Sequence, residues 1–139
     1  EFRADLCYLG HLNAIKEELT PLENLMAAAR LADETLSEDD AIDALEQVGL
    51  AGREDLACKY LSQGQKRRVA LARTVALDPM LIMYDEPFAG LDPISLTVVG
   101  DLIRRLNDTL GATSIVVTHD IQESLKIVDY VYFMANGVI

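Results

Sequence analysis

The amino-acid sequence predicts an α/β protein, in which a parallel β-sheet with flanking helices is joined to an α-helical subdomain. Three observations predict this class. The second half of the 139-residue chain alternates short apolar runs with amphipathic segments, as strand–helix–strand units do. Prolines, glycines and capping residues separate these segments. The first half contains two acidic, well-capped helical segments and only one short strand-like run.

The first half is predicted to hold a strand fragment followed by two helices. Residues 6–9 form the strand-like run. Thr20, followed by Pro and then by Glu at the third helical position, is typical of a helix start, and this helix should extend to about Leu31. Ser37 starts a second helix by the same logic, and Gly49 ends it.

The second half is predicted to alternate helices and strands. In order along the chain, we expect a helix at 62–77, a buried strand at 80–84, a helix at 94–110, a second buried strand at 113–118, a helix at 120–128 and a third strand at 130–134. The dipeptide Asn136-Gly137 then predicts a hairpin turn. Because strands alternate with helices, the sheet should be parallel, with helices on its faces.

Composition and charge exclude several classes of protein. Half of the residues are hydrophobic, which is enough for a packed core, but no apolar run approaches the ~20 residues that span a bilayer. The net charge of −11 argues against a nucleic-acid partner. Cys7 and Cys58 match no metal-binding spacing, so we expect ordinary thiols. Residues 1–5 lead into no long apolar stretch, so no signal peptide is expected and a cytoplasmic location follows by default.

Polar residues follow two of the predicted strands at their carboxyl ends, where sheets of this class bind ligands. Asp85 could coordinate Mg²⁺, and the adjacent Glu86 could orient a water for attack on a phosphate. The alternative for both is an acidic turn before Pro87. His119, after the next strand, could stabilise transition-state charge, although a lone histidine is more often structural.

A second candidate site is the start of the helix at 62–77. Ser62, Gly64 and Gln65 lie where free backbone N–H groups and the positive end of the helix dipole can hold phosphate. Gly64 would let the backbone approach a ligand closely. An ordinary capped helix is the alternative. Asp92 has a complete role as the N-cap of the next helix, and it can serve a ligand as well.

Together these residues resemble the ATPase domain of ABC transporters. Residues 61–65 are similar to the family's signature motif, Leu-Ser-Gly-Gly-Gln, with Gln63 in place of the first glycine. Residues 81–86 are similar to the Walker B strand with its catalytic glutamate. Residues 89–92 resemble the D-loop, and residues 118–120 resemble the switch-histidine loop. The four motifs stand in the family's order over almost the entire chain.

The resemblance implies a P-loop NTPase-like fold, truncated at its N-terminus, with ATP and Mg²⁺ as cofactors. Two such domains pair head to tail around ATP. Ser62 and Gly64 would then contact the γ-phosphate bound to a partner domain, and Gln65 and Asp92 would complete this nucleotide-binding set.

The same resemblance assigns the strand-end residues to the nucleotide of their own chain. Asp85 would hold Mg²⁺, Glu86 would be the water-orienting base, and His119 would be the switch that senses the γ-phosphate. Residues 20–60 would be a helical subdomain that meets membrane subunits, residues 1–19 would hold the Q-loop and a strand end, and residues 61–139 the other core motifs.

Two departures from the family pattern matter. The sequence contains no glycine-rich loop ending in Lys-Ser or Lys-Thr, which we expect upstream of Glu1. The Q-loop glutamine of the family falls at His11, whose imidazole can still hydrogen-bond a metal-bound water and so belongs to the predicted nucleotide-binding residues.

The two halves of the chain resemble different ABC subfamilies. Residues 9–11, 15–25 and 61–68 are similar to the haem-exporter ATPase of cytochrome c biogenesis. Residues 78–139 are similar to the ATPase of Mla-type phospholipid-trafficking transporters. Our hypothesis is a mosaic joined at residues 67–73, whose pattern is common to both.

The resemblance therefore implies an ATP-hydrolysing subunit of a bacterial ABC transporter for a haem- or phospholipid-type cargo, placed at the inner face of the membrane. One alternative is an interaction module that dimerises but hydrolyses no ATP by itself. A DNA-repair or chromosome ATPase is disfavoured, because residues 20–60 contain no long coiled coil and the chain is acidic.

Overall fold

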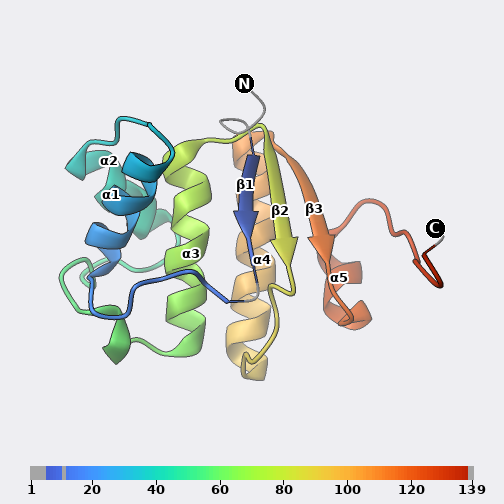
Figure 1. Cartoon of the computed structure of the whole chain (residues 1–139). Helices are drawn as coiled ribbons and strands as arrows, with labels where there is room; N and C mark the ends of the chain where they lie inside the picture. Colours follow the sequence, from blue (N-terminus) through green and yellow to red (C-terminus); the bar gives the residue numbers. More distant parts are fainter. Residues whose placement is uncertain (1–5, 11, 138–139) are drawn as a thin grey trace.

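The computed structural model describes residues 6–10 and 12–137 and contains a three-stranded parallel sheet (Figure 1). The strands are β1 (Leu6–Leu9), β2 (Leu81–Asp85) and β3 (Thr113–Val117), and they lie side by side in the order β1-β2-β3. Asp85, the last residue of β2, is paired with Val117, the last residue of β3. The α/β class and the parallel sheet are thus confirmed.

Helices make both connections between the strands, as the alternating pattern predicts. Between β1 and β2 the chain forms α1 (Pro21–Leu31), α2 (Glu38–Gln47), the 3₁₀ helix η1 (Cys58–Tyr60) and α3 (Gln63–Leu77). Between β2 and β3 it forms α4 (Pro93–Leu110), and after β3 it forms α5 (Ile121–Ile127). These bounds agree with the predicted helices to within one or two residues.

Local capping explains why the helix starts are well predicted. The side chains of Thr20 and Ser62 each accept a hydrogen bond from the backbone N–H three residues on. The Glu or Gln side chain at that position accepts in turn from the backbone N–H of the capping residue, so both starts form full capping boxes. At the C-terminal end of α4, Gly111 has a φ of +65°, the left-handed conformation that closes many helices. These interactions involve only neighbours in the sequence.

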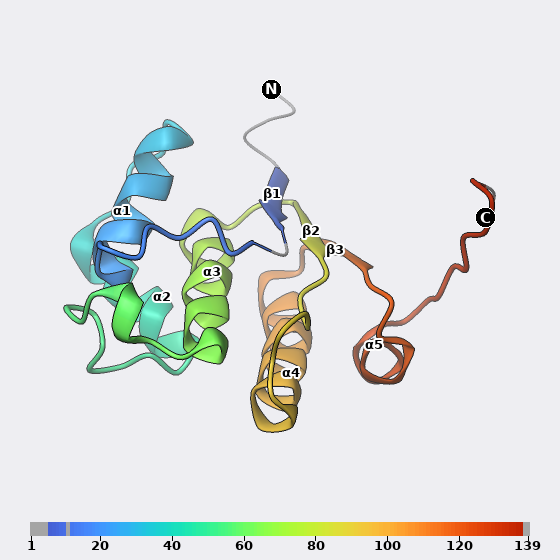
Figure 2. The ribbon, with the colours of Figure 1, turned by 60° about the horizontal axis from the view of Figure 1, so that its bottom comes forward.

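The helices cover one face of the sheet, contrary to the prediction that they flank both (Figure 2). Side chains that point toward the helices are buried, among them Leu9, Ile82 and Tyr84. The alternate side chains of β3 are open to solvent, with Ile115 43% and Val117 51% exposed. Successive strand residues point to opposite faces, so covering one face leaves every second residue exposed. The prediction that β3 is a buried strand was therefore wrong.

The prediction of a third strand at 130–134 is also wrong. The described chain has no strand there, and the five side chains, all apolar or aromatic, are exposed. A strand requires a neighbouring strand to satisfy its backbone groups, and residues 130–134 do not pair with β3. The turn itself is present, because Asn136 and Gly137 have φ of +52° and +76°, the signs that a type I′ turn requires.

Two expectations from composition can be compared with the structure. Cys7 and Cys58 are both free and buried, as expected of ordinary thiols. No helix in the described part of the chain has the length and apolar character needed to cross a bilayer.

Candidate functional site

The carboxyl ends of β2 and β3 bring Glu86 and His119 into direct contact. Glu86 follows β2, Thr118 and His119 follow β3, and the parallel pairing aligns the two strand ends. The Thr118 hydroxyl donates a hydrogen bond to Glu86 Oε2 at 3.1 Å, and the His119 ring Nδ1 lies 2.9 Å from Glu86 Oε1. The His119 backbone N–H adds a bond of 3.2 Å to the same oxygen. Two predicted residues thus form one polar cluster.

The backbone of Glu86 adopts an unusual conformation that aims its side chain at β3. Its φ is +50°, in the left-handed region that residues other than glycine rarely occupy. Its backbone N–H donates to the Val117 carbonyl at 2.8 Å, which ties this turn to the neighbouring strand. Such conformations cost about 1 kcal/mol or more and are concentrated at functional sites, which supports a functional role for Glu86.

The contacts favour an ionised glutamate beside a charged histidine. Burial alone would raise the pKa of Glu86, but hydrogen bonds from His119 and Thr118 outweigh it and hold that pKa below its usual value. The hydrogen bond to Glu86 raises the pKa of His119 above its usual value. Because the His119 side chain is 84% exposed and that of Glu86 is 27% exposed, a ligand can reach both. An ionised carboxylate can accept a proton, and an imidazolium can stabilise negative charge.

Asp85 has a partner that the sequence analysis missed. The Tyr8 hydroxyl on β1 donates a 2.7 Å hydrogen bond to Asp85 Oδ2, and this bond raises the pKa of Tyr8. Alternation in β1 indicates that Tyr8 faces away from buried Cys7 and Leu9. Which strand lies beside it is a tertiary property, so only the fold could identify the contact.

The donor atoms around Asp85 fit Mg²⁺ only as a site completed by a ligand. Asp85 supplies carboxylate oxygens, the hard donors that Mg²⁺ prefers. Among the residues that the structure describes, no group of three or more His, Cys, Asp or Glu could hold a metal ion. Mg²⁺ commonly binds one or two carboxylates together with substrate phosphates and waters, which this arrangement allows.

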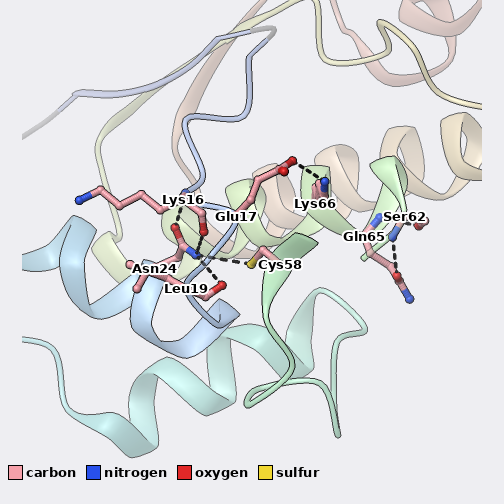
Figure 3. Close-up of polar contacts among 8 residues, drawn as sticks. All are labelled: Lys16, Glu17, Leu19, Asn24, Cys58, Ser62, Gln65 and Lys66. Atoms are coloured by element: carbon pink, nitrogen blue, oxygen red, sulfur yellow. Dashed lines mark hydrogen bonds and ion pairs between the residues drawn. The ribbon is translucent and has the colours of Figure 1, made fainter. Parts of the chain in front are cut away.

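Ser62 and Gln65 lie at the start of α3 (Figure 3), with Gly64 between them in the sequence. Ser62 Oγ accepts the Gln65 backbone N–H at 3.2 Å, and Gln65 Oε1 accepts the Ser62 backbone N–H at 2.9 Å. Both polar side chains thus cap their own helix, which is the alternative considered for this segment. The cap leaves the first turn with its positive dipole end, so phosphate binding there remains compatible with the geometry.

Gly64 has a structural reason to be glycine apart from any ligand. A β-carbon placed on Gly64 would lie 2.5 Å from Ser95 Oγ and 2.8 Å from Ser95 Cβ, closer than real contacts permit. Ser95 lies in the first turn of α4 and is held by Asp92, which accepts from Ser95 Oγ at 2.6 Å and from the Ser95 backbone N–H at 3.0 Å. The starts of α3 and α4 therefore touch at Gly64.

The predicted residues thus form two groups at the same end of the fold. One contains Asp85, Glu86 and His119; the other is the start of α3 together with Asp92. The strands point toward this end, and α3 and α4 begin there (Figure 1). Within residues 6–10 and 12–137, no hydrogen bond or ion pair joins the two groups. His11, the remaining predicted residue, lies outside the described residues.

Known proteins similar to this chain were found at the level of family, sequence and structure. A family model described as ABC transporter matches residues 1–89. The cytochrome c biogenesis ATP-binding export protein CcmA of Dechloromonas aromatica is 68% identical over 119 residues, which is 86% of this chain and 58% of the relative. The intermembrane phospholipid transport system ATP-binding protein MlaF of Haemophilus influenzae is 58% identical over 92 residues, 66% of this chain and 35% of the relative.

Both subfamilies expected from the sequence are therefore among the relatives, and the chain spans only part of the length of each.

Two solved structures are similar in fold to this chain. A dimeric post-hydrolysis state of the ATP-binding cassette MJ0796 with ADP and Pi has a TM-score of 0.72 at 29% identity, over 87% of this chain and 55% of the other. The ADP conformation of the cassette MJ1267 has a TM-score of 0.86 at 24% identity, over 98% and 59%, which supports the fold alone.

Proposed function

Because the chain belongs to the ABC transporter family, we propose that it supplies the ATP-hydrolysing residues of a bacterial ABC transporter subunit. The observation that carries the proposal is the contact between Glu86 and His119 at the carboxyl ends of two parallel strands. Ligands bind at this edge in sheets of this class. The left-handed backbone of Glu86 supports the same assignment, because it directs the carboxylate toward His119 and Thr118.

The geometry supports a proposed role for each of these residues. Glu86, held ionised by its hydrogen bonds, orients a water and accepts its proton as the water attacks the terminal phosphate. His119, whose pKa is raised by its hydrogen bond to Glu86, stabilises negative charge on the transferred phosphoryl group. Asp85, steadied by the Tyr8 hydroxyl, would hold Mg²⁺. Mg²⁺ bound with the nucleotide would neutralise the charge that develops on the phosphate oxygens.

The start of α3 would act on a nucleotide held by a second ATPase domain. Its backbone N–H groups and dipole suit a γ-phosphate, and the Ser62 capping box gives this turn a defined shape. The described chain offers no contact between this turn and Glu86, which is consistent with the two groups serving different nucleotides. His11 and Asp92 are proposed to complete the nucleotide contacts.

The partners, location and cargo are proposed from the family and the relatives. We infer a head-to-tail pair of ATPase domains bound to transmembrane subunits at the cytoplasmic face of the membrane, with no nucleic-acid partner. The names of the two relatives speak of cytochrome c biogenesis and phospholipid transport. They favour a hydrophobic or amphipathic cargo of the haem or phospholipid type.

An ATP hydrolysis assay on the 139-residue chain tests the proposal. Phosphate release from Mg-ATP is measured for the chain alone and after mixing with the full-length Dechloromonas relative, which offers a second domain. Glu86→Gln should lower the chain's contribution to phosphate release by about 10²-fold or more, which is the usual effect of removing a general base. Glu34→Gln, a matched change at an exposed glutamate, should leave it unchanged.

The outcomes separate the proposal from its rival. Glu86-dependent release supports the hydrolytic role. Stimulation of the relative that depends on Ser62 but not on Glu86 would favour the interaction module, which hydrolyses nothing by itself. If the chain neither binds Mg-ATP nor changes the turnover of the relative, both are wrong.

A further inference from the structure

A buried asparagine holds the segment between β1 and α1 in place. We call residues 12–20 the connecting segment. Asn24 of α1 is only 8% exposed, and its Oδ1 accepts the Lys16 backbone N–H at 2.9 Å. Its Nδ2 donates to the Lys16 carbonyl at 3.0 Å, as Figure 3 shows, and to the Thr20 carbonyl at 3.0 Å. A buried amide with its donors and acceptor satisfied is costly to move, so the connecting segment has a defined path.

The other side of the connecting segment is bonded to the turn that precedes α3. The backbone N–H of Cys58 donates to the Leu19 carbonyl at 2.9 Å, and that of Lys59 donates to the Glu17 carbonyl at 2.8 Å. Residues 58–60 form η1, which ends two residues before Ser62. Main-chain hydrogen bonds thus fix the position of the connecting segment relative to the turn that leads into α3.

An ion pair joins the connecting segment to α3 itself. Lys66 Nζ lies 2.5 Å from Glu17 Oε1 (Figure 3), and the Lys66 side chain is only 10% exposed while that of Glu17 is 55% exposed. Lys66 is in the first turns of α3, where the helix dipole disfavours a cation. A nearly buried ammonium at such a position requires a carboxylate partner, and Glu17 is that partner.

Two further basic residues of α3 reach the same region of the chain. Arg67 Nη1 donates to the Gly10 carbonyl at 3.0 Å, and Arg73 Nη2 donates to the Asn13 carbonyl at 3.1 Å. α3 thus contacts the chain from the end of β1 to Glu17 through three cationic side chains. Lys66 makes its contact to a charged group, Glu17, so the Glu17–Lys66 pair is an electrostatic link that a single substitution can remove.

We propose that Glu17 and Lys66 are positioning residues, which set the place of the Ser62–Gln65 turn relative to the connecting segment. Movement of the connecting segment would then be passed directly to the turn, because the ion pair and the η1 bonds tie the two together. The proposal rests on the proposed function only in taking this turn as the one that contacts phosphate. The physical coupling does not depend on it.

Amide hydrogen exchange of the 139-residue chain, measured without nucleotide, tests the coupling. Glu17→Gln removes the charge, and Lys66→Met removes the ammonium while keeping an apolar stem. Glu18→Gln is the matched control, because Glu18 is exposed and makes no hydrogen bond or ion pair with the described residues. Lys66→Arg keeps the charge, and the double variant Glu17→Lys/Lys66→Glu reverses the pair.

We expect the Lys59, Gln65 and Lys66 amides to exchange roughly three- to ten-fold faster in Glu17→Gln, since one partner is half-exposed and its attraction is screened. Amides of α2, whose described residues make no hydrogen bond to Glu17 or Lys66, should be unchanged. Lys66→Arg and the reversed pair should restore most of the protection, which loss of packing alone would not allow.

Equal exchange in Glu17→Gln and Glu18→Gln would overturn the proposal, as would a failure of both charge-preserving variants to restore protection. Glu17→Gln alone decides the matter if Lys66→Met does not fold. Because no nucleotide is present, a failure of the proposed ATPase role would leave this result intact.

Discussion

Substituting Gly64 by alanine should destabilise the fold, although alanine is the better helix former. The added β-carbon would lie 2.5 Å from Ser95 Oγ. Ser95 cannot turn aside freely, because its hydroxyl is bonded to Asp92 Oδ2 at 2.6 Å. Relief therefore requires either loss of that bond or separation of the starts of α3 and α4.

The magnitude follows from two opposing effects. Overpacking a well-packed contact costs about 1–3 kcal/mol. Replacing a helical glycine by alanine gains about 1 kcal/mol. The net loss in the free energy of unfolding should be about 1 kcal/mol, or roughly 3–5 °C in Tm for a chain of this length.

Gly100 of α4 offers a matched control for the same chemical change. A β-carbon there would lie 3.7 Å from Phe88 Cε1 and 3.8 Å from Ile127 Cγ2, which are ordinary contacts. Gly100→Ala should therefore stabilise the chain by about 0.5–1 kcal/mol through helix propensity alone. Urea unfolding, followed by circular dichroism, compares the two variants at equal protein concentration.

Compensation at Ser95 completes the test. Ser95→Gly removes the atoms that the new β-carbon would strike, so Gly64→Ala should cost less in that background than in the parent chain. The reasoning would be refuted if Gly64→Ala stabilised the chain as much as Gly100→Ala does. A Gly64→Ala chain of normal stability with weakened nucleotide contact would instead assign the glycine to the ligand.

Two further measurements address the ionisable groups. In an NMR titration, His119 should titrate above the usual histidine pKa, and Glu86→Gln should lower its pKa; His11→Asn assigns the other histidine. The contribution of the pair to the free energy of unfolding should fall as pH rises through the raised pKa of His119. It should also fall as pH drops through the lowered pKa of Glu86. A free energy of unfolding that does not change over these pH ranges would contradict the contact. Cys7 and Cys58, whose pKa values burial raises, should react with a thiol reagent only in urea; fast labelling of the native chain would show that they are accessible.

Most of the element boundaries could be predicted because their signals are local. The capping boxes at Thr20 and Ser62 and the closing Gly111 act within one helical turn, and each stands where the sequence placed it. The strand at 130–134 could not be judged in this way. Its apolar residues suit a strand, but a strand exists only beside another strand, which the composition of five residues cannot specify.

The candidate site shows the same division. Parallel alternation of strands and helices was enough to place Glu86 and His119 at one edge of the sheet, and their contact is found. Gly64 is different: the sequence suggested close approach of a ligand, whereas the fold shows close approach of Ser95. A missing side chain does not reveal which neighbour requires the space.

The sequence by itself determined the order of the strands and α-helices from β1 to α5, the capped starts of α1, α3 and α4, and the polar residues at the strand ends. These depend on interactions within a few residues. Only the tertiary structure decided that Tyr8 holds Asp85 and that Glu17 pairs with Lys66. The first two residues are 77 positions apart in the sequence, and the second two are 49 positions apart. Such pairs depend on which strand and which helix become neighbours, and that choice is made by burying the common core.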